Sequence, residues 1–267
     1  MKKYAIIGSG GFIAQRHKQA IQDTGGEVVL TCDIDPTPKT DFTDYREMFS
    51  SPWMDEVDAI SICTPNYLHV EMVRDALRTG KKVLCEKPLC INTDFTGMKG
   101  VNVVYQLHFH PLFNEVQEKL KKASKIKVFW KAYRDDEFWK SWKGDESKSG
   151  GVAYVFGAHV IDLLISALGK KSFIIGVKDD VRKSEGLIDI GDKLIEYSFE
   201  FLDSTNGQAR FFEIDGKKYV FSTQDNLAFE NLHSKVYENL WNKKVSQLED
   251  IIPSIQLIDK IKKYKNL

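Results

Sequence analysis

AIIGSGGFIA, from Ala5 to Ala14, decides how this chain of 267 residues folds. A short apolar run, Tyr4 to Ile7, predicts a strand. The small residues from Gly8 to Gly11 follow, and the next segment, FIAQRHKQAIQD, predicts a helix. This order is typical of a dinucleotide-binding unit. Gly8 permits the tight turn, and Gly10 leaves room for a pyrophosphate. Free N–H groups at the helix start can donate hydrogen bonds to that anion, which predicts cofactor contacts at Gly11, Phe12 and Ile13.

An acidic residue lies at the distance from this turn that a dinucleotide requires. Ile13 occupies the third glycine position, so the glycine pattern alone also fits an ordinary strand-to-helix turn. The run from Glu27 to Cys32, however, predicts a second strand that ends at Asp33, whose carboxylate can accept both ribose hydroxyls of NAD. It would repel the 2′-phosphate of NADP, and no Arg follows between residues 34 and 38. We therefore predict NAD as the cofactor; the alternative is that Asp33 only begins a loop.

Composition argues against several classes of partner. Lys plus Arg equal Asp plus Glu at 38 each, so no net field favours nucleic acid or an anionic membrane. The start, MKKYAIIGSGGFIA, superficially resembles a signal peptide, but glycine interrupts its apolar run after Ile7. No uninterrupted apolar run reaches the roughly eighteen residues that span a bilayer. We expect a soluble, cytoplasmic protein.

The cysteines indicate neither a metal site nor a disulfide framework. The four are Cys32, Cys63, Cys85 and Cys90. Their wide spacing matches no zinc motif, and three of them end or lie in apolar runs, where a reduced thiol behaves as a small hydrophobe. We predict no bound metal.

The first part of the chain alternates between strand and helix patterns. Strands are predicted at Val57–Cys63, Lys82–Cys85 and Val101–Gln106, and helices within residues 41–51 and 67–80. Such alternation predicts a doubly wound parallel sheet, in which ligands bind at the carboxyl ends of the strands. The Gly8 turn, Asp33 and the residues that follow the third and fourth strands should therefore converge. We predict an NAD-binding Rossmann domain over residues 1–108.

The remaining residues, 109–267, predict an α+β domain with an open, mainly antiparallel sheet. In the segment from Ile195 to Phe201 apolar and polar residues alternate, as in a strand with one wet face, and Asp215-Gly216 indicates a hairpin. The strands of this part are predicted at residues 126–133, 173–177, 193–201, 209–214 and 219–222. The helices are predicted at residues 112–123, 151–168, 233–241 and 247–264. An open sheet with an exposed apolar face predicts a homodimer or homotetramer.

The order of the motifs resembles the Gfo/Idh/MocA family of NAD(P)-dependent sugar oxidoreductases over essentially the whole chain. The motifs are the glycine turn, CTPNYLH from Cys63 to His69, CEKPL from Cys85 to Leu89 and GAHVID from Gly157 to Asp162. Three segments are also similar to those of UDP-N-acetylglucosaminuronate 3-dehydrogenases: FIAQRH, YQLHFH and FWKSWKGDESKSGGVA, the last from Phe138 to Ala153.

The resemblance implies roles for individual residues. The resemblance implies that Lys87 of the EKP motif and His159 of the later helix are catalytic. It also implies that both of these residues contact the substrate. Cofactor contacts are implied at Thr64, Pro65, Asn66, His69, Glu86, Lys87 and Gln106, with Glu86 beside the nicotinamide ribose. Oxidising a secondary alcohol needs a hydride acceptor and a group that takes the hydroxyl proton. We favour His159 as the base and Lys87 as the group that polarises the hydroxyl, although Lys87 is the alternative base.

Several features bear on the substrate. The segment from Phe138 to Ala153 carries aromatic rings, ammonium groups and hydroxyls, which suit the uracil, pyrophosphate and carboxylate of a nucleotide sugar. We therefore predict substrate contacts at Trp142, Lys143 and Lys148. The alternative is that this segment is a solvated loop. Arg16 and Arg134 are further candidate anion contacts. His17 and His69 are expected to pack or cap helices, His108 and His110 could reach the substrate, and His233 has no predicted role. Many family members carry an acidic or amide residue where this chain has Val155.

The resemblance thus implies NAD-dependent oxidation of C3 of UDP-N-acetylglucosaminuronate to the 3-keto sugar, in a bacterial pathway for surface polysaccharide such as the lipopolysaccharide O-antigen. It also implies that 2-oxoglutarate recycles the reduced cofactor. Two alternatives remain open: a dehydrogenase of the same family that acts on another sugar, nucleotide sugar or inositol, and a non-catalytic NAD-binding regulator.

Overall fold

The computed structural model describes residues 1–36, 39–221 and 232–264, which form two compact units. Unit 1 consists of Met1–Cys90 and Asp94–Gln106 with the described part of Glu230–Asp250. Unit 2 consists of Ile91–Thr93 with the described parts of Leu107–Phe229 and Ile251–Leu267.

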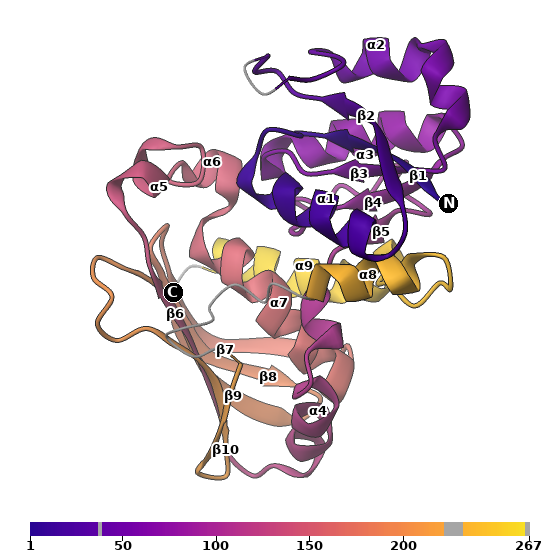
Figure 1. Cartoon of the computed structure of the whole chain (residues 1–267). Coiled ribbons are helices and arrows are strands. Elements are labelled where there is room, and N and C mark those ends of the chain that lie inside the picture. The colour runs from indigo at the N-terminus through magenta and orange to yellow at the C-terminus, as the bar shows by residue number, and fades with distance from the viewer. Residues whose placement is uncertain (37–38, 222–231, 265–267) are drawn as a thin grey trace. The chain divides into compact units, whose positions relative to one another are not determined.

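Unit 1 is built on a parallel sheet of five strands in the order β2-β1-β3-β4-β5 (Figure 1). The strands are β1 (Lys3–Ile7), β2 (Glu27–Cys32), β3 (Ala59–Ile62), β4 (Lys82–Cys85) and β5 (Asn102–Val103). The central strands are short apolar runs that are almost fully buried, as expected of a parallel sheet covered on both faces. Helices α1 (Phe12–Asp23) and α3 (His69–Arg78) lead toward opposite edges of the sheet, so right-handed crossovers place them on opposite faces.

A late segment of the chain completes unit 1. Helix α8 (Leu232–Leu240) packs against α1, and Trp241 Nε1 donates to Tyr4 Oη at 2.9 Å. The backbone N–H of Val103 donates to the carbonyl of Ser246 at 2.8 Å. The shorter elements of this unit are α2 (Tyr45–Ser50), η1 (Pro52–Glu56) and η2 (Asn66–Leu68). The first switch of units falls at Gln106/Leu107, and the chain later returns to unit 1. The division into domains of residues 1–108 and 109–267 stays a prediction.

Unit 2 is built on a sheet of six strands in the order β11-β10-β6-β9-β8-β7. These are β6 (Ile126–Tyr133), β7 (Ser172–Asp179), β8 (Lys183–Ile190), β9 (Lys193–Leu202), β10 (Ala209–Ile214) and β11 (Lys217–Val220). All pairs are antiparallel except β6 with β9, which is parallel. Asp215 and Gly216 form the β10–β11 turn with positive φ at both residues, as the hairpin prediction requires.

Helix α7 (Gly151–Leu168) covers one face of this sheet (Figure 1). Gly157 of this helix faces Ile258 and Phe199, which an added Cβ would meet at 3.5 Å, an ordinary packing distance. Among the described residues, the segment Glu146–Leu168 is long and apolar enough to cross a membrane, but 83% of its apolar stretch of 18 residues is buried inside the fold, as in a core helix. The remaining helices are η3 (Gln106–Phe109), α4 (Phe113–Lys122), α5 (Asp136–Lys140), α6 (Glu146–Ser149) and α9 (Leu248–Lys263).

The predicted fold class is confirmed, and most elements lie within one or two residues of their predicted bounds. Strand β8 was not predicted, because KSEGLIDI is polar at several positions and carries a glycine. The predicted strand at residues 219–222 corresponds to β11, and its last residue, Ser222, lies outside the described residues. All four cysteines are buried and free.

Candidate functional site

The glycine turn lies at the carboxyl end of β1. Gly8 has a φ of +79°, and a Cβ there would lie 2.9 Å from the carbonyl carbon and oxygen of Cys63. Gly10 and Gly11 are exposed, and no side chain caps the start of α1, so the first N–H groups of that helix remain available to an anion. Phe12 is 74% exposed beside this turn. These features fit the pyrophosphate of a dinucleotide.

Asp33 follows β2 at the same edge of the sheet. Its carboxylate accepts the backbone N–H of Gly10 at 2.8 Å and that of Asp35 at 3.0 Å, so it is fixed against the glycine turn. A carboxylate offers about four acceptor positions, which leaves about two for ribose hydroxyls. The predicted proximity of Asp33 to the glycine turn is confirmed by this geometry.

The loops after β3 and β4 lie next to the glycine turn and Asp33. Ile7 pairs with both Cys32 and Ile62, and Ile62 pairs with Cys85, so the four strands end side by side. Thr64 and Pro65 are half-buried, whereas Asn66 and Gln106 are buried. Gln106 Oε1 has no hydrogen-bond partner among the described residues. The carboxyl edge of the sheet therefore gathers the predicted cofactor residues of unit 1.

His69 joins two of these loops. Its Nδ1 contacts the carbonyl oxygen of Pro88 at 2.8 Å, and its Nε2 contacts that of Thr64 at 2.9 Å. The ring is fully buried at the first position of α3. His69 thus connects the loop after β3 to the loop that carries Lys87, which agrees with the packing role predicted for it. A direct contact between His69 and the cofactor stays a prediction.

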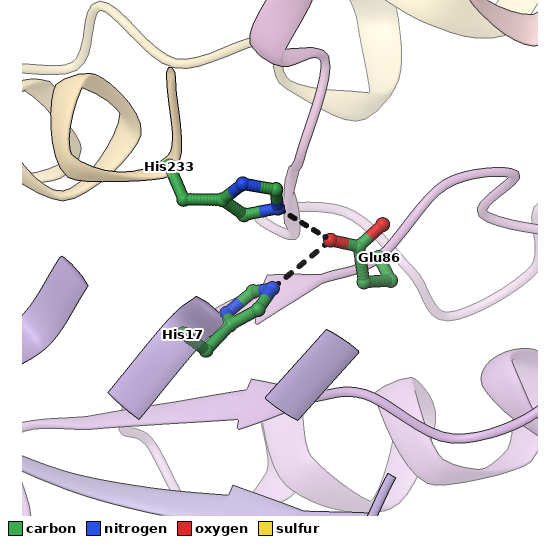
Figure 2. A group of neighbouring side chains, drawn as sticks. All are labelled: His17, Glu86 and His233. Carbon is green, nitrogen blue, oxygen red and sulfur yellow. Dashed lines mark hydrogen bonds and ion pairs between the residues drawn. The ribbon is translucent and has the colours of Figure 1, made fainter. Parts of the chain in front are cut away.

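The carboxylate of Glu86 is the centre of a buried cluster that the sequence did not reveal (Figure 2). Its Oε1 contacts His17 Nε2 at 2.9 Å and His233 Nε2 at 3.3 Å, and its Oε2 accepts the backbone N–H of Lys87 at 3.1 Å. The network continues from His17 Nδ1 to the hydroxyl of Tyr237 at 2.7 Å, and from there to Ser61 Oγ at 2.7 Å. His17 comes from α1, His233 from α8 and Glu86 from the end of β4.

The charges of this cluster follow from its hydrogen bonds. Burial would raise the pKa of Glu86, but hydrogen bonds from His17 and His233 outweigh it and hold the pKa well below its usual range. Burial lowers the pKa of His17 despite that partner. We therefore assign an ionised Glu86 and a neutral His17 that donates through Nε2 and accepts from Tyr237 through Nδ1.

The spacing of these groups would also suit a metal ion, since one ligand atom from each of the three lies within 4.8 Å of the others. The hydrogen bonds to Glu86 account for the arrangement without a metal ion. The absence of a metal stays a prediction. The contact predicted between Glu86 and the nicotinamide ribose also stays a prediction, since the carboxylate here has these three partners.

Unit 2 carries the other predicted residues. His159 is buried in the middle of α7, one turn after the half-buried Val155. Nearby in sequence, Asp162 accepts a hydrogen bond from Ser254 Oγ at 3.1 Å and contacts His108 Nε2 at 2.5 Å. His108 therefore has a partner within unit 2, and so does His110, whose ring packs at 4.8 Å from that of Phe221.

The predicted substrate segment forms α5, α6 and the turn between them. Trp142 is half-buried, Lys143 is exposed, and Lys148 pairs with Asp145 at 3.2 Å. Asp135 and Asp145 cap the two helices by accepting N–H groups of Phe138 and Ser147. In unit 1, the guanidinium of Arg16 lies 5.1 Å from the ring centre of Phe12. Substrate contacts at these residues stay predictions.

Sequence reasoning missed the histidines that hold Glu86. His17 was expected only to pack, and His233 had no assigned role, yet both contact the residue next to Lys87. No local signal could have identified them, because the three residues are separated by 69 and 147 positions in the chain.

Comparisons with known proteins agree with this geometry. Residues 2–96 match the family model for an oxidoreductase family with an NAD-binding Rossmann fold. The WlbA (WbpB) dehydrogenase of Thermus thermophilus, solved with NAD and alpha-ketoglutarate and with NAD and UDP-GlcNAcA, is 26% identical with a TM-score of 0.85. That alignment covers 100% of this chain and 96% of the other.

The curated relatives include two oxidoreductases of Bacillus subtilis. The oxidoreductase YrbE is 31% identical over 71% of this chain, and the scyllo-inositol 2-dehydrogenase (NADP(+)) IolU is 27% identical over 73% of it. The chain spans 59% and 55% of their lengths, respectively. With their Rossmann sheet, glycine turn and family match, residues 2–96 belong to the Gfo/Idh/MocA family of NAD-binding oxidoreductases.

Proposed function

We propose that this protein oxidises the C3 hydroxyl of UDP-N-acetylglucosaminuronate to a 3-keto sugar with NAD, in the synthesis of a bacterial surface polysaccharide such as the lipopolysaccharide O-antigen. The observation that carries the proposal is the alignment over the whole chain with a dehydrogenase solved with NAD and UDP-GlcNAcA. The glycine turn, the uncapped start of α1 and the fixed carboxylate of Asp33 support the choice of NAD.

The proposed chemistry uses the residues that the family resemblance implies to be catalytic, Lys87 and His159. NAD supplies a hydride acceptor when it is bound to the residues at the carboxyl edge of the unit 1 sheet. Lys87 polarises and orients the substrate hydroxyl, and His159 takes its proton. Glu86 fixes the backbone of Lys87 through the hydrogen bond from that residue's N–H. In this scheme 2-oxoglutarate reoxidises the cofactor, as suggested by its presence in the structure of the Thermus relative.

Two other functions have support of their own. A dehydrogenase that acts on another sugar or an inositol is favoured by relatives such as IolU and a glucose-6-phosphate 3-dehydrogenase. A non-catalytic NAD-binding regulator is favoured by Val155, an apolar residue one helical turn before His159, where the family resemblance implies an acidic or amide side chain.

A turnover assay separates the three functions. Purified protein freed of nucleotides is mixed with NAD or NADP, 2-oxoglutarate and UDP-N-acetylglucosaminuronate, scyllo-inositol or glucose 6-phosphate, and products are identified by mass spectrometry. We expect a nucleotide-sugar product two hydrogen atoms lighter than the substrate, formed faster with NAD than with NADP because of Asp33. Turnover of only the other substrates would favour the second function. NAD binding with no turnover of any substrate would favour a regulator.

We further propose that the cytoplasmic enzyme is a homodimer or homotetramer. On unit 2, Phe173 and Ile175 of β7 and Leu194 of β9 are each more than half exposed, and a second copy would remove these apolar side chains from water. Light scattering should give a mass of two or four chains, and Ile175→Lys should lower it. A monomeric wild type would contradict this proposal.

A further inference from the structure

Helix α8 reaches the carboxylate of Glu86 by two routes, both within unit 1. His233 Nε2 contacts Glu86 Oε1 directly at 3.3 Å. One turn later, the hydroxyl of Tyr237 contacts His17 Nδ1 at 2.7 Å, and His17 Nε2 contacts the same carboxylate oxygen at 2.9 Å. Because residues four apart lie on one face of a helix, His233 and Tyr237 face the cluster together. A late segment of the chain thus holds the residue that follows β4.

The two histidines fix the orientation of the Glu86 carboxylate. Figure 2 shows both imidazole rings approaching the same carboxylate oxygen, one from α1 and the other from α8. The other oxygen, Oε2, accepts the backbone N–H of Lys87 at 3.1 Å. The carboxylate cannot turn without breaking the hydrogen bonds to both rings, so Oε2 stays on the N–H of Lys87.

A second contact fixes the loop on the other side of Lys87. His69 Nδ1 contacts the carbonyl oxygen of Pro88 at 2.8 Å, and His69 Nε2 contacts that of Thr64 at 2.9 Å. His69 is fully buried at the start of α3. The backbone of Lys87 is therefore held at its own N–H and at the carbonyl of the next residue. Of these two contacts, the one at the N–H depends on α8.

The buried charge of this cluster suits positioning better than it suits stability. Glu86, His17 and His233 are all buried. Burial opposes ionisation of Glu86, yet hydrogen bonds from the two histidines hold its pKa well below the usual range. Removing a charge from water carries a large desolvation penalty, and well-packed apolar side chains of similar volume often stabilise a fold as well or better. What apolar side chains cannot supply is a fixed acceptor for the N–H of Lys87.

We propose that His233 and Tyr237 are positioning residues for Lys87, acting through Glu86. They hold the carboxylate that fixes the backbone of Lys87, and so they set the point from which its side chain extends. The stem of a lysine is long and flexible, so a fixed origin limits the volume that its ammonium group searches. The action of Lys87 on a substrate hydroxyl rests on the function proposed above, whereas the hold of α8 on its backbone does not.

Hydrogen exchange in the ligand-free, full-length protein, followed by NMR, tests the positioning without turnover. His233→Leu removes one donor to Glu86 and keeps a side chain of similar size. We expect the Lys87 amide to exchange at least tenfold faster than in the wild type, while the amides of β1 keep their protection, because only a local contact is lost. Tyr237→Phe should raise the same rate by a smaller factor. His233→Gln, whose amide can still donate to Glu86, should restore slow exchange.

Turnover of UDP-N-acetylglucosaminuronate with NAD gives the second readout. His233→Leu should lower kcat and kcat/KM in the same proportion, by about tenfold or more, because a misplaced group loses an interaction made in the transition state. Ser234→Ala is the matched control, since Ser234 Oγ on the same helix donates to Asp23 of α1 at 3.1 Å rather than to Glu86. It should leave both kcat and the Lys87 exchange rate unchanged.

Three results would overturn the proposal. The first is Lys87 exchange that is equal in the wild type and in His233→Leu. The second is faster exchange that extends equally to the amides of β1, which would show a purely structural role for His233. The third is an active wild type whose kcat is unchanged in His233→Leu. Local loss of Lys87 protection in His233→Leu, in a protein that turns over no nucleotide sugar, would contradict the proposed function alone.

Discussion

Lys87→Ala and His159→Ala are each expected to lower kcat by about 10²–10⁴-fold, since this is the usual contribution of a positioned acid–base group. NAD affinity should change little in His159→Ala, because His159 belongs to unit 2 and the glycine turn and Asp33 belong to unit 1. Stopped-flow or steady-state turnover with the substrate identified by the product assay would measure the loss, and NAD titration would confirm that the cofactor still binds.

The dependence of rate on pH separates the two roles. If His159 is the base, the acidic limb of the kcat/KM profile should persist in Lys87→Ala at a lower rate and disappear in His159→Ala. The reverse pattern would assign the base to Lys87. Lys99→Ala is the control, because Lys99 is an exposed lysine of unit 1 and should turn over like the wild type. Wild-type activity in both the Lys87 and His159 variants would contradict the proposed chemistry.

The features that could be predicted from the sequence have local causes. The glycine turn with α1, the strands β2, β4 and β10, and the Asp215-Gly216 hairpin each depend on residues within a dozen positions. Their convergence followed from one rule, that parallel strands end at the same edge of a sheet. Asp33 was placed beside the glycine turn in this way, and its hydrogen bond to Gly10 shows the result.

The features that could not be predicted depend on tertiary pairing. The parallel pairing of β6 with β9 and the return of α8 to unit 1 are set by packing between segments far apart in the chain. The same holds for His17, Glu86 and His233, which reach one another only when α1, β4 and α8 are assembled. Histidines on a helix give no sign of whether they face a carboxylate, so a packing role was the simplest expectation for them.

Glu86→Gln is expected to destabilise the protein by about 3 kcal/mol, the usual cost of breaking a buried charged network. The glutamine amide can accept from the two histidines or from the N–H of Lys87, but not from both sides, because its NH₂ group would then face a donor. Urea unfolding followed by circular dichroism would measure the loss. Glu71→Gln removes an exposed carboxylate that pairs with Arg46 and should have little effect.

The same network predicts how stability depends on pH. The pKa of Glu86 is held well below its value in the unfolded chain, so its contribution is fully present above about pH 4.5 and is lost as the pH falls toward the folded value. The pKa of His17 is also lowered, mainly by burial, so unfolding takes up a proton and stability declines as the pH falls below about 6.5. His17→Gln should therefore flatten the decline between about pH 6.5 and 5, and Glu86→Gln should flatten it below about pH 4.5. An acid limb that is identical in the wild type and both variants would show that these buried groups do not control it, and would leave exposed carboxylates as its cause.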